Sequence, residues 1–295
     1  VAGLNLGGGK AVIIGDPKTQ KNEMLFRAYG RYVQSLDGRY ITAEDVGTSV
    51  QAMEWVRMET DHVTGIARSL GGSGDPSPVT AFGVFQAMKA SLKYKTGSES
   101  LEGRTVAVQG VGHVGYHLVK HLREAGALCI VTDVDRDALK KVTRDFTGVE
   151  AVAPDAIYDA PADVFAPCAL GAVVNDETIP RLKVGVICGA TNNVLADEDR
   201  HAPMLAARDI TFAPDYVVNS GGLINVANEL EGYNPERALQ HAANIYDITM
   251  NIFRVAAEQG ITTLQAANHI AEQRIKALGQ IKDRYVGRPP ARLHR

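Results

Sequence analysis

Hydrophobic and polar positions in the first third of this chain follow two periodicities, one typical of strands and one typical of helices. Short apolar runs at 11–14 and 40–43 predict strands, and the segments 22–36 and 49–59 have the spacing of amphipathic helices. In the first helix apolar residues recur every three or four positions, so they form one stripe that should pack on a sheet. The stripe consists of Leu25, Ala28, Tyr29, Tyr32, Val33 and Leu36. The pattern predicts an α/β domain at the start of the chain.

A different pattern follows in the middle of the chain. Short β-prone runs alternate with helical segments, and continuous apolar runs of this length are typical of a parallel sheet covered by helices on both faces. The runs lie at 105–109, 128–132, 162–166, 184–188 and 211–212. They predict a doubly wound α/β domain.

Residues 235–278 are helical in pattern almost throughout, with a break at Gly260. The positions that keep helical spacing there are Ile245, Thr249, Ile252, Phe253 and Ala256.

The densest cluster of Gly, Pro and Ser lies at 71–78, and such clusters interrupt regular structure. We therefore place a domain junction there. The predicted division is a substrate domain over 1–70, a doubly wound domain over 71–262, and a C-terminal helix and tail over 263–295 that return to the first domain. The tail 284–295 is basic and is expected to be loosely held.

Composition excludes several classes of protein. The chain has 295 residues, 45% of them hydrophobic and 22% charged, with a net charge of -3, which is typical of a soluble globular protein. The charge balance predicts no nucleic-acid partner. Because no apolar run is long enough to span a bilayer, we expect no membrane partner and a cytoplasmic location. Cys129, Cys168 and Cys188 are far apart, so we expect buried reduced thiols and no metal site.

A glycine motif directly follows the first strand of the predicted sheet. Gly110, Gly112 and Gly115 have the spacing GxGxxG and open a helix, with His113 and Val114 between them. The first glycine permits a tight turn, the second lets the backbone approach a pyrophosphate, and the third lets helix and strand pack closely. The helix N-terminus then faces the phosphates. The motif predicts dinucleotide binding in a Rossmann-like domain, the alternative being a turn that binds nothing.

An acidic residue ends the next predicted strand. Asp133 lies 23 residues after Gly110, where a carboxylate can accept hydrogen bonds from an adenosine ribose. It would also repel a 2′-phosphate, which favours NAD over NADP, whereas the nearby Arg136 works against that preference.

Two residues of the first domain are candidates for acid–base chemistry. Lys10 follows three glycines and precedes a predicted strand, which is the wrong order for a P-loop. Taken alone, it is either a solvated surface lysine or a base whose pKa falls on burial in a closing cleft. Asp45 ends a strand-like run before Val46-Gly47, a position that suits a turn residue and a catalytic acid equally.

Several long segments match one family, in the same order along the chain. They are LNLGGGKAVIIGDP (4–17), RYITAEDVGT (39–48), GDPSPVTA (74–81), FAPCALG (165–171), GATNN (189–193) and APDYVVNSGG (213–222). The chain resembles the amino-acid dehydrogenase family of glutamate, leucine, phenylalanine and valine, in its leucine/valine/phenylalanine branch. The resemblance extends over essentially the whole chain up to the tail.

The resemblance implies NAD-dependent oxidative deamination of an L-amino acid to a 2-oxo acid and ammonia, and the reverse reaction. Hydride would leave the substrate Cα for the nicotinamide and give an iminium. Lys10, with a lowered pKa, would activate the water that attacks this carbon, and Asp45 would exchange protons with the amino nitrogen. The family also implies a homo-oligomer, from dimer to octamer.

The resemblance also assigns binding residues. Asn219 would hold the substrate carboxylate, Asn192 would orient nicotinamide and substrate, and Thr80 would reach the amide end of the cofactor. Read without the family, either asparagine could equally be turn chemistry. The remaining assignments are Cys168 and Ala169 at the cofactor, and Ala43, Leu223 and Val226 around the substrate side chain.

This sequence departs from the family pattern before the glycine-rich start. A second lysine that pairs with the substrate carboxylate belongs there, as do the first strands of the substrate domain, so we expect the sequence to be part of a longer enzyme. Asp75 and Ser220 stand where Asn and Ala are common, and neither change removes a required group.

The alternatives differ in substrate or in class. A glutamate dehydrogenase would leave the side-chain carboxylate of its substrate unpaired among Ala43, Leu223 and Val226. Ala43 favours a branched aliphatic substrate, leucine first, while Leu223 keeps phenylalanine open and valine is the next aliphatic choice. A noncatalytic NAD-binding regulator would have no need of Lys10 and Asp45.

Overall fold

The computed structural model describes residues 1–282, and these divide into two compact units that we consider one at a time. Unit 1 contains residues 1–2, 77–221 and 242–282, and unit 2 contains residues 3–76 and 222–241. The chain changes unit between Pro76 and Ser77. Residues 222–241 belong to unit 2, and the helix that starts at Thr263 contacts elements of unit 1.

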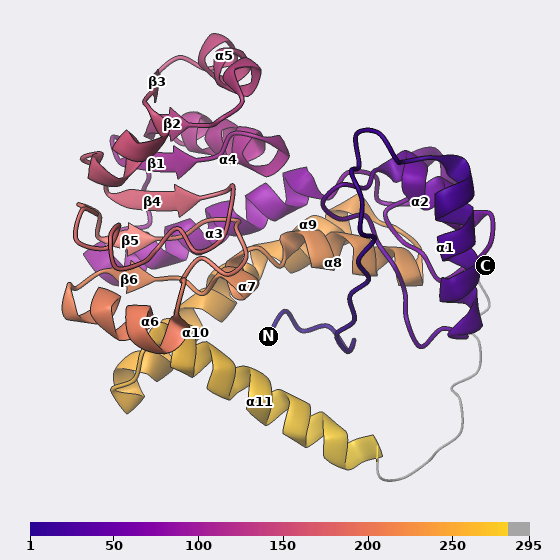
Figure 1. Cartoon of the computed structure of the whole chain (residues 1–295). Helices are drawn as coiled ribbons and strands as arrows, with labels where there is room; N and C mark the ends of the chain where they lie inside the picture. The colour runs from indigo at the N-terminus through magenta and orange to yellow at the C-terminus, as the bar shows by residue number, and fades with distance from the viewer. Residues whose placement is uncertain (283–295) are drawn as a thin grey trace. The chain divides into compact units, whose positions relative to one another are not determined.

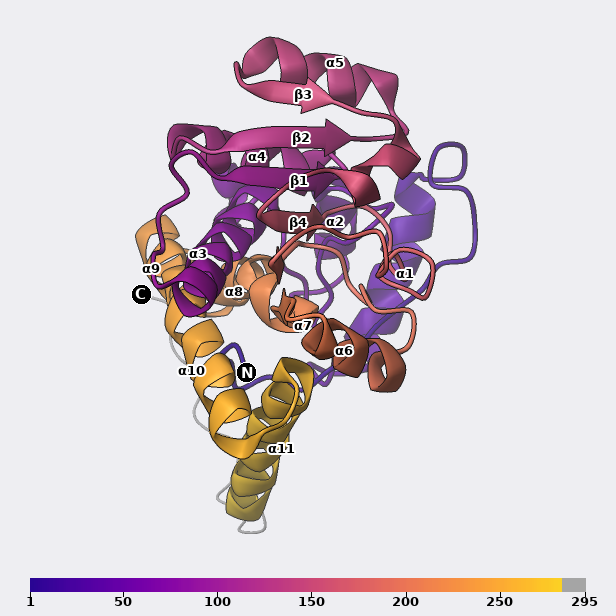
Figure 2. The same ribbon diagram turned by 90° about the vertical axis from the view of Figure 1, so that its left-hand side faces the viewer.

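Unit 1 is built on a six-stranded parallel sheet in the order β3-β2-β1-β4-β5-β6. The strands are β1 (Thr105–Gln109), β2 (Leu128–Thr132), β3 (Val149–Ala151), β4 (Val164–Pro167), β5 (Val186–Ile187) and β6 (Thr211–Phe212). The arrows of β1 to β4 point the same way in Figure 2. The chain order reverses between β1 and β4, and in sheets of this kind ligands bind beyond the carboxyl ends of the strands at that reversal.

Side-chain alternation gives the sheet two buried faces. Ala107, Phe165, Ile187 and Phe212 are neighbours across four strands and join one apolar core with Leu205. The opposite face packs under helices, since the Cys188 thiol donates to the carbonyl of Val84 at 3.7 Å. Because both faces are covered, the strands appear in the sequence as continuous apolar runs.

Helices alternate with most strands of unit 1, as in a doubly wound domain, although β5 follows β4 with no helix between them (Figure 1). They are α3 (Ser77–Thr96), α4 (His113–Glu124), α5 (Arg136–Asp145), α6 (Glu198–Ala207), α7 (Asp215–Val218), α10 (Ile245–Gln259) and α11 (Thr263–Lys282), with the 3-10 turn η2 (Pro154–Asp159). The five residues predicted to form the apolar stripe of α10 are all buried, and Gly260 ends that helix in the left-handed conformation.

Unit 2 is helical where it is regular. Its elements are α1 (Glu23–Ser35), α2 (Val50–Arg57), η1 (Arg68–Leu70), η3 (Asn228–Glu231), α9 (Pro235–Ala243) up to His241, and α8 (Gly221–Ala227) after its first residue. The Asn22 side chain caps α1 by accepting from the Leu25 N–H at 2.9 Å, and Ser49 caps α2 in the same way. The two helices pack through a core of Phe26, Ala52, Met53, Val56, Val63 and Ile66.

Three expectations for this unit were wrong. The buried face of α1 contains Phe26, Gly30 and Val33, whereas Tyr32 is 76% exposed, and α1 packs on α2 instead of a sheet. Residues 11–14 form no strand, because no described segment pairs with their backbone. Residues 40–43 contribute only an isolated bridge between Thr42 and Val63. The predicted tail 284–295 lies outside the described residues.

Candidate functional site

The glycine turn lies at the carboxyl end of β1. Gly110 has φ +96°, and a Cβ there would lie 2.7 Å from the Cβ of Ala169 and 2.9 Å from the carbonyl carbon of Cys168. A Cβ on Gly115 would lie 2.0 Å from the Gly110 oxygen. Both glycines are therefore needed by the fold itself, since any side chain would meet backbone or a close neighbour.

Gly112 is different. A Cβ at this position would meet nothing within 4 Å. Gly112 is also the N-cap of α4, and no side chain occupies the first N–H groups of that helix. An open backbone position at a helix N-terminus is the arrangement that binds a pyrophosphate. The turn therefore fits a dinucleotide, and His113 is exposed at the first position of the helix.

Asp133 directly follows β2 and contacts the glycine turn. Its Oδ2 accepts a hydrogen bond from the Val111 N–H at 2.7 Å, and its Oδ1 accepts from the Asp135 N–H at 2.9 Å. These bonds hold the carboxylate beside the phosphate-facing loop, one strand away from Gly110. In dinucleotide-binding domains an acid at this position accepts hydrogen bonds from the adenosine ribose hydroxyls.

A second pair of site residues follows β5 and β6. The Asn219 Nδ2 donates to the Asn192 Oδ1 at 2.6 Å and to the Ala190 carbonyl at 3.1 Å. Both hydrogens of the Asn219 amide thus have acceptors within the protein. For Asn219 to donate to a substrate carboxylate, it must exchange one of these acceptors for the substrate.

Thr80 lies in the first turn of α3 and is close in space to Gly221, two residues after Asn219. A Cβ on Gly221 would lie 3.1 Å from the Cα of Thr80 and 2.4 Å from the Val79 oxygen. The start of α3 therefore touches the chain two residues after Asn219. Within unit 1 the structure therefore places Cys168 and Ala169 against the glycine turn, Asn192 against Asn219, and Thr80 against Gly221.

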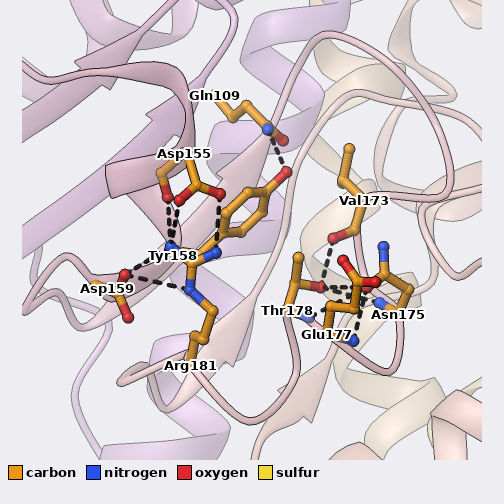
Figure 3. A network of polar contacts seen from close by, with 9 residues as sticks. All are labelled: Gln109, Asp155, Tyr158, Asp159, Val173, Asn175, Glu177, Thr178 and Arg181. Atoms are coloured by element: carbon orange, nitrogen blue, oxygen red, sulfur yellow. Dashed lines mark hydrogen bonds and ion pairs between the residues drawn. The ribbon is translucent and has the colours of Figure 1, made fainter.

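An ion-pair network supports the loops that follow β3 and β4 (Figure 3). Arg181 donates to the carboxylates of Asp155 and Asp159 and lies over the Tyr158 ring, 5.4 Å from its centroid. The Tyr158 hydroxyl accepts from the Gln109 Nε2 at 2.8 Å, and Gln109 precedes Gly110. The hydrogen bonds from Arg181 hold the pKa values of both aspartates below their usual range. This network connects the η2 turn to the end of β1 that carries the glycine turn.

Lys10 and Asp45 meet in unit 2. The Lys10 Nζ forms an ion pair with the Asp45 Oδ2, although the two residues are 35 positions apart. Asp45 is held by its turn, because its Oδ1 accepts from the Val46 N–H at 2.7 Å and its N–H donates to the Thr48 hydroxyl at 2.8 Å. The side chains are 68% and 52% exposed, so the burial expected for Lys10 is not present within the unit.

The three predicted side-chain pocket residues also belong to unit 2. Ala43 is half-buried two residues before Asp45, Val226 is buried, and Leu223 is 54% exposed. Leu223 and Val226 are on α8, one turn apart, while Ala43 follows the bridge residue Thr42. The sequence analysis missed one residue that connects these two segments, Glu229, whose partners are far away in the sequence.

Other chemistry is limited in the part of the chain that the structure describes. Within residues 1–282 no cluster of three or more His, Cys, Asp or Glu side chains is placed to bind a metal ion. None of the helices described is both long and apolar enough to cross a membrane. The three cysteines are free thiols, and burial raises the pKa of Cys129 to about 12.

Comparisons with known proteins agree with this geometry. Residues 1–62 match the family model described as "Glu/Leu/Phe/Val dehydrogenase, dimerisation domain", and residues 71–281 match "Glutamate/Leucine/Phenylalanine/Valine dehydrogenase". A leucine dehydrogenase of Thermoactinomyces intermedius is 54% identical over 97% of this chain and 77% of its own length. A valine dehydrogenase of Streptomyces albus is 50% identical over 93% and 76%. The crystal structure of L-tryptophan dehydrogenase from Nostoc punctiforme has a TM-score of 0.80 at 44% identity, covering 95% of this chain and 80% of that one.

Proposed function

Because this chain belongs to the glutamate/leucine/phenylalanine/valine dehydrogenase family, we propose that it catalyses NAD-dependent oxidative deamination of a branched-chain aliphatic L-amino acid, leucine first. The products are the 2-oxo acid, ammonia and NADH, and the reaction is reversible. The ion pair of Lys10 with Asp45 is the single observation that supports this reaction most, since it brings two acid–base groups together in a chain that also has a dinucleotide turn.

Residues of unit 1 bind the cofactor, and residues of unit 2 carry out the acid–base chemistry. Gly112 and the N-terminus of α4 bind the pyrophosphate, and Asp133 binds the ribose. NAD, when bound, supplies the acceptor for the hydride that leaves the substrate Cα. Lys10 takes a proton from the water that attacks this carbon, and Asp45 exchanges protons with the amino nitrogen. Asn192 and Asn219 orient the substrate carboxylate and the nicotinamide.

The preference for an aliphatic substrate rests on the side chains assigned to the pocket. Ala43, Leu223 and Val226 offer no hydrogen-bond donor to a side-chain carboxylate, so glutamate would be bound with an unpaired charge. The 54% identity to a leucine dehydrogenase favours the same choice. The likeness to valine and tryptophan dehydrogenases makes valine and an aromatic amino acid the substrates to compare.

The direct experiment measures initial rates with leucine, valine, phenylalanine and glutamate, with NAD and with NADP, by the absorbance of the reduced cofactor. We expect the highest kcat/KM with leucine and NAD. A preference for glutamate, or no turnover of any amino acid, would contradict the proposal.

The acid–base roles are tested by two substitutions. Lys10→Ala should lower kcat by several orders of magnitude with little change in NAD affinity, and Asp45→Asn, which is nearly isosteric, should fold normally and fail in both directions of the reaction. Retained turnover in Lys10→Ala would remove Lys10 from the mechanism. A change in substrate KM alone in Asp45→Asn would make Asp45 a binding residue.

We further propose that the enzyme works as a homo-oligomer, because residues 1–62 match the segment described as a dimerisation domain. Light scattering of the purified protein checks this, and a monomer at working concentration would contradict it.

A further inference from the structure

Glu229 gathers hydrogen bonds from two distant segments of unit 2. Its Oε1 accepts from the Gly65 N–H at 2.7 Å, from the Ser73 N–H at 2.7 Å, and from the Ser73 hydroxyl. Ser73 is fully buried and Gly65 is buried, while Glu229 itself is half-buried. We call Glu229, Gly65 and Ser73 the Glu229 clasp. A carboxylate that accepts several N–H and O–H bonds at a buried site holds its partners more strongly than a neutral acceptor does.

One side of the clasp leads to Ala43. Gly65 follows Thr64, whose N–H donates to the Thr42 carbonyl at 2.8 Å. Gly65 also packs directly on the next residues of that segment, because a Cβ on Gly65 would lie 3.2 Å from both the backbone N and the Cβ of Glu44. The segment held by the clasp therefore touches the residue between Ala43 and Asp45.

The other side of the clasp leads to Leu223 and Val226. Glu229 lies in η3, which continues directly from α8, and Val226 is three positions before it. The same segment is held further by Arg237, which donates to the Asn228 side chain and to the Gly232 carbonyl. The Gly65 N–H thus joins the segment of Ala43 to the helix of Leu223 and Val226 through the Glu229 Oε1, and Ser73 donates two further hydrogen bonds to the same oxygen.

We propose that Glu229 is a positioning residue that determines substrate specificity, because it sets the spacing between the two walls of the side-chain pocket. The inference rests on the proposed function. Glu229 does not touch the substrate. It fixes the distance between Ala43 on one side and Leu223 and Val226 on the other. The pocket can then distinguish two substrates whose side chains differ by one methylene.

The test compares Glu229→Ala and Glu229→Gln with wild type on leucine, valine and norvaline. Apolar pockets distinguish substrates that differ by one methylene by about 10- to 200-fold in kcat/KM. This discrimination requires the residues that line the pocket to keep their positions. In Glu229→Ala the ratio of kcat/KM for leucine over valine should fall by about fivefold or more towards unity, while the KM for NAD stays unchanged. Glu229→Gln keeps an acceptor oxygen without the charge, so it should restore part of the ratio. Glu236→Gln, an exposed glutamate in α9, is the matched control and should keep the wild-type ratio.

A second variant and a second measurement cover the case in which Glu229→Ala fails to fold. Ser73→Ala removes one donor and leaves two, and should shift the same ratio in the same direction by less. Hydrogen exchange of the Gly65 and Ser73 amides, measured without substrate, should be faster in Glu229→Gln than in Glu236→Gln.

Ratios that stay at the wild-type value in folded, active Glu229 and Ser73 variants would overturn the inference. So would an equal loss of kcat/KM on all substrates, or the same shift in Glu236→Gln. A wild-type enzyme without activity on any apolar amino acid would overturn the proposed function, and the specificity role with it. An active wild type with unchanged ratios in the variants overturns the specificity role alone.

Discussion

Two of the three glycines in the motif after β1, Gly112 and Gly115, should respond differently when each is replaced by alanine. Gly115→Ala places a methyl group 2.0 Å from the Gly110 oxygen, which is far inside contact distance. Overpacking of this kind costs about 1–3 kcal/mol, and a chain of this size loses roughly 2–4 °C in Tm per kcal/mol. We therefore expect a fall in Tm of about 2–12 °C.

Gly112→Ala meets nothing within 4 Å, and φ at this position is -66°, which lies outside the left-handed region that favours glycine. Its stability should therefore stay within about 1 kcal/mol of wild type. The same methyl group stands where a pyrophosphate must approach the backbone, and losing one charge-assisted hydrogen bond weakens binding by roughly 1.5–3 kcal/mol. NAD affinity should fall by about 10- to 100-fold.

The assay pairs thermal unfolding with calorimetric titration of NAD, on wild type and both variants. The reasoning fails if Gly112→Ala binds NAD as tightly as wild type, because the open position would then have no role in binding. It also fails if the two variants lose equal Tm, since the difference between a crowded and an open glycine would have no physical effect.

Three further outcomes follow from other contacts. Asp133→Ala should weaken NAD binding and narrow the preference over NADP in steady-state kinetics, and an unchanged NAD/NADP ratio would assign cofactor choice to another residue. Ala43→Gly should shift the ratio of kcat/KM from leucine towards phenylalanine, and an unmoved ratio would take Ala43 out of the pocket wall. Arg181→Met should lower Tm at neutral pH, and the difference from wild type should shrink below about pH 4, where unpaired aspartates protonate. The sign follows because Arg181 lowers the pKa of Asp155 and Asp159, so this stability exists above the ordinary pKa and disappears as pH falls through the lowered values; a difference independent of pH would refute it.

The sheet could be predicted wherever strands are covered on both faces. The bounds predicted for β1 and β2 are the observed ones, because burial on two sides makes the central positions of both strands apolar. β3 escaped prediction since it is a three-residue strand at the sheet edge with two exposed positions. The run at 11–14 failed for the opposite reason: it is apolar enough, yet a strand needs a pairing partner, and periodicity says nothing about partners.

Candidate site residues could be predicted where they form a local sequence motif, and could not where their partners are distant in the sequence. Gly110, Gly112 and Gly115 could be identified because they form a short motif with a fixed spacing. Gly110 and Gly115 are required by their immediate surroundings, whereas a Cβ on Gly112 would meet nothing within 4 Å. Glu229 could not be identified, because two of its three donors are the backbone N–H groups of Gly65 and Ser73, which leave no trace in the sequence, and the third, the Ser73 hydroxyl, lies 156 positions away.

The ion pair of Lys10 and Asp45 is largely exposed in unit 2, so this unit alone does not exclude water from Lys10. A lysine that is 68% exposed keeps most of its hydration, and a base that works near neutral pH needs a site from which water is excluded. In the mechanism we propose, the apolar side chain and Cα of the substrate come next to Lys10 and displace this water. Binding of an apolar amino acid and activation of Lys10 would then be one event, so a substrate too small to exclude water should lose kcat as well as affinity.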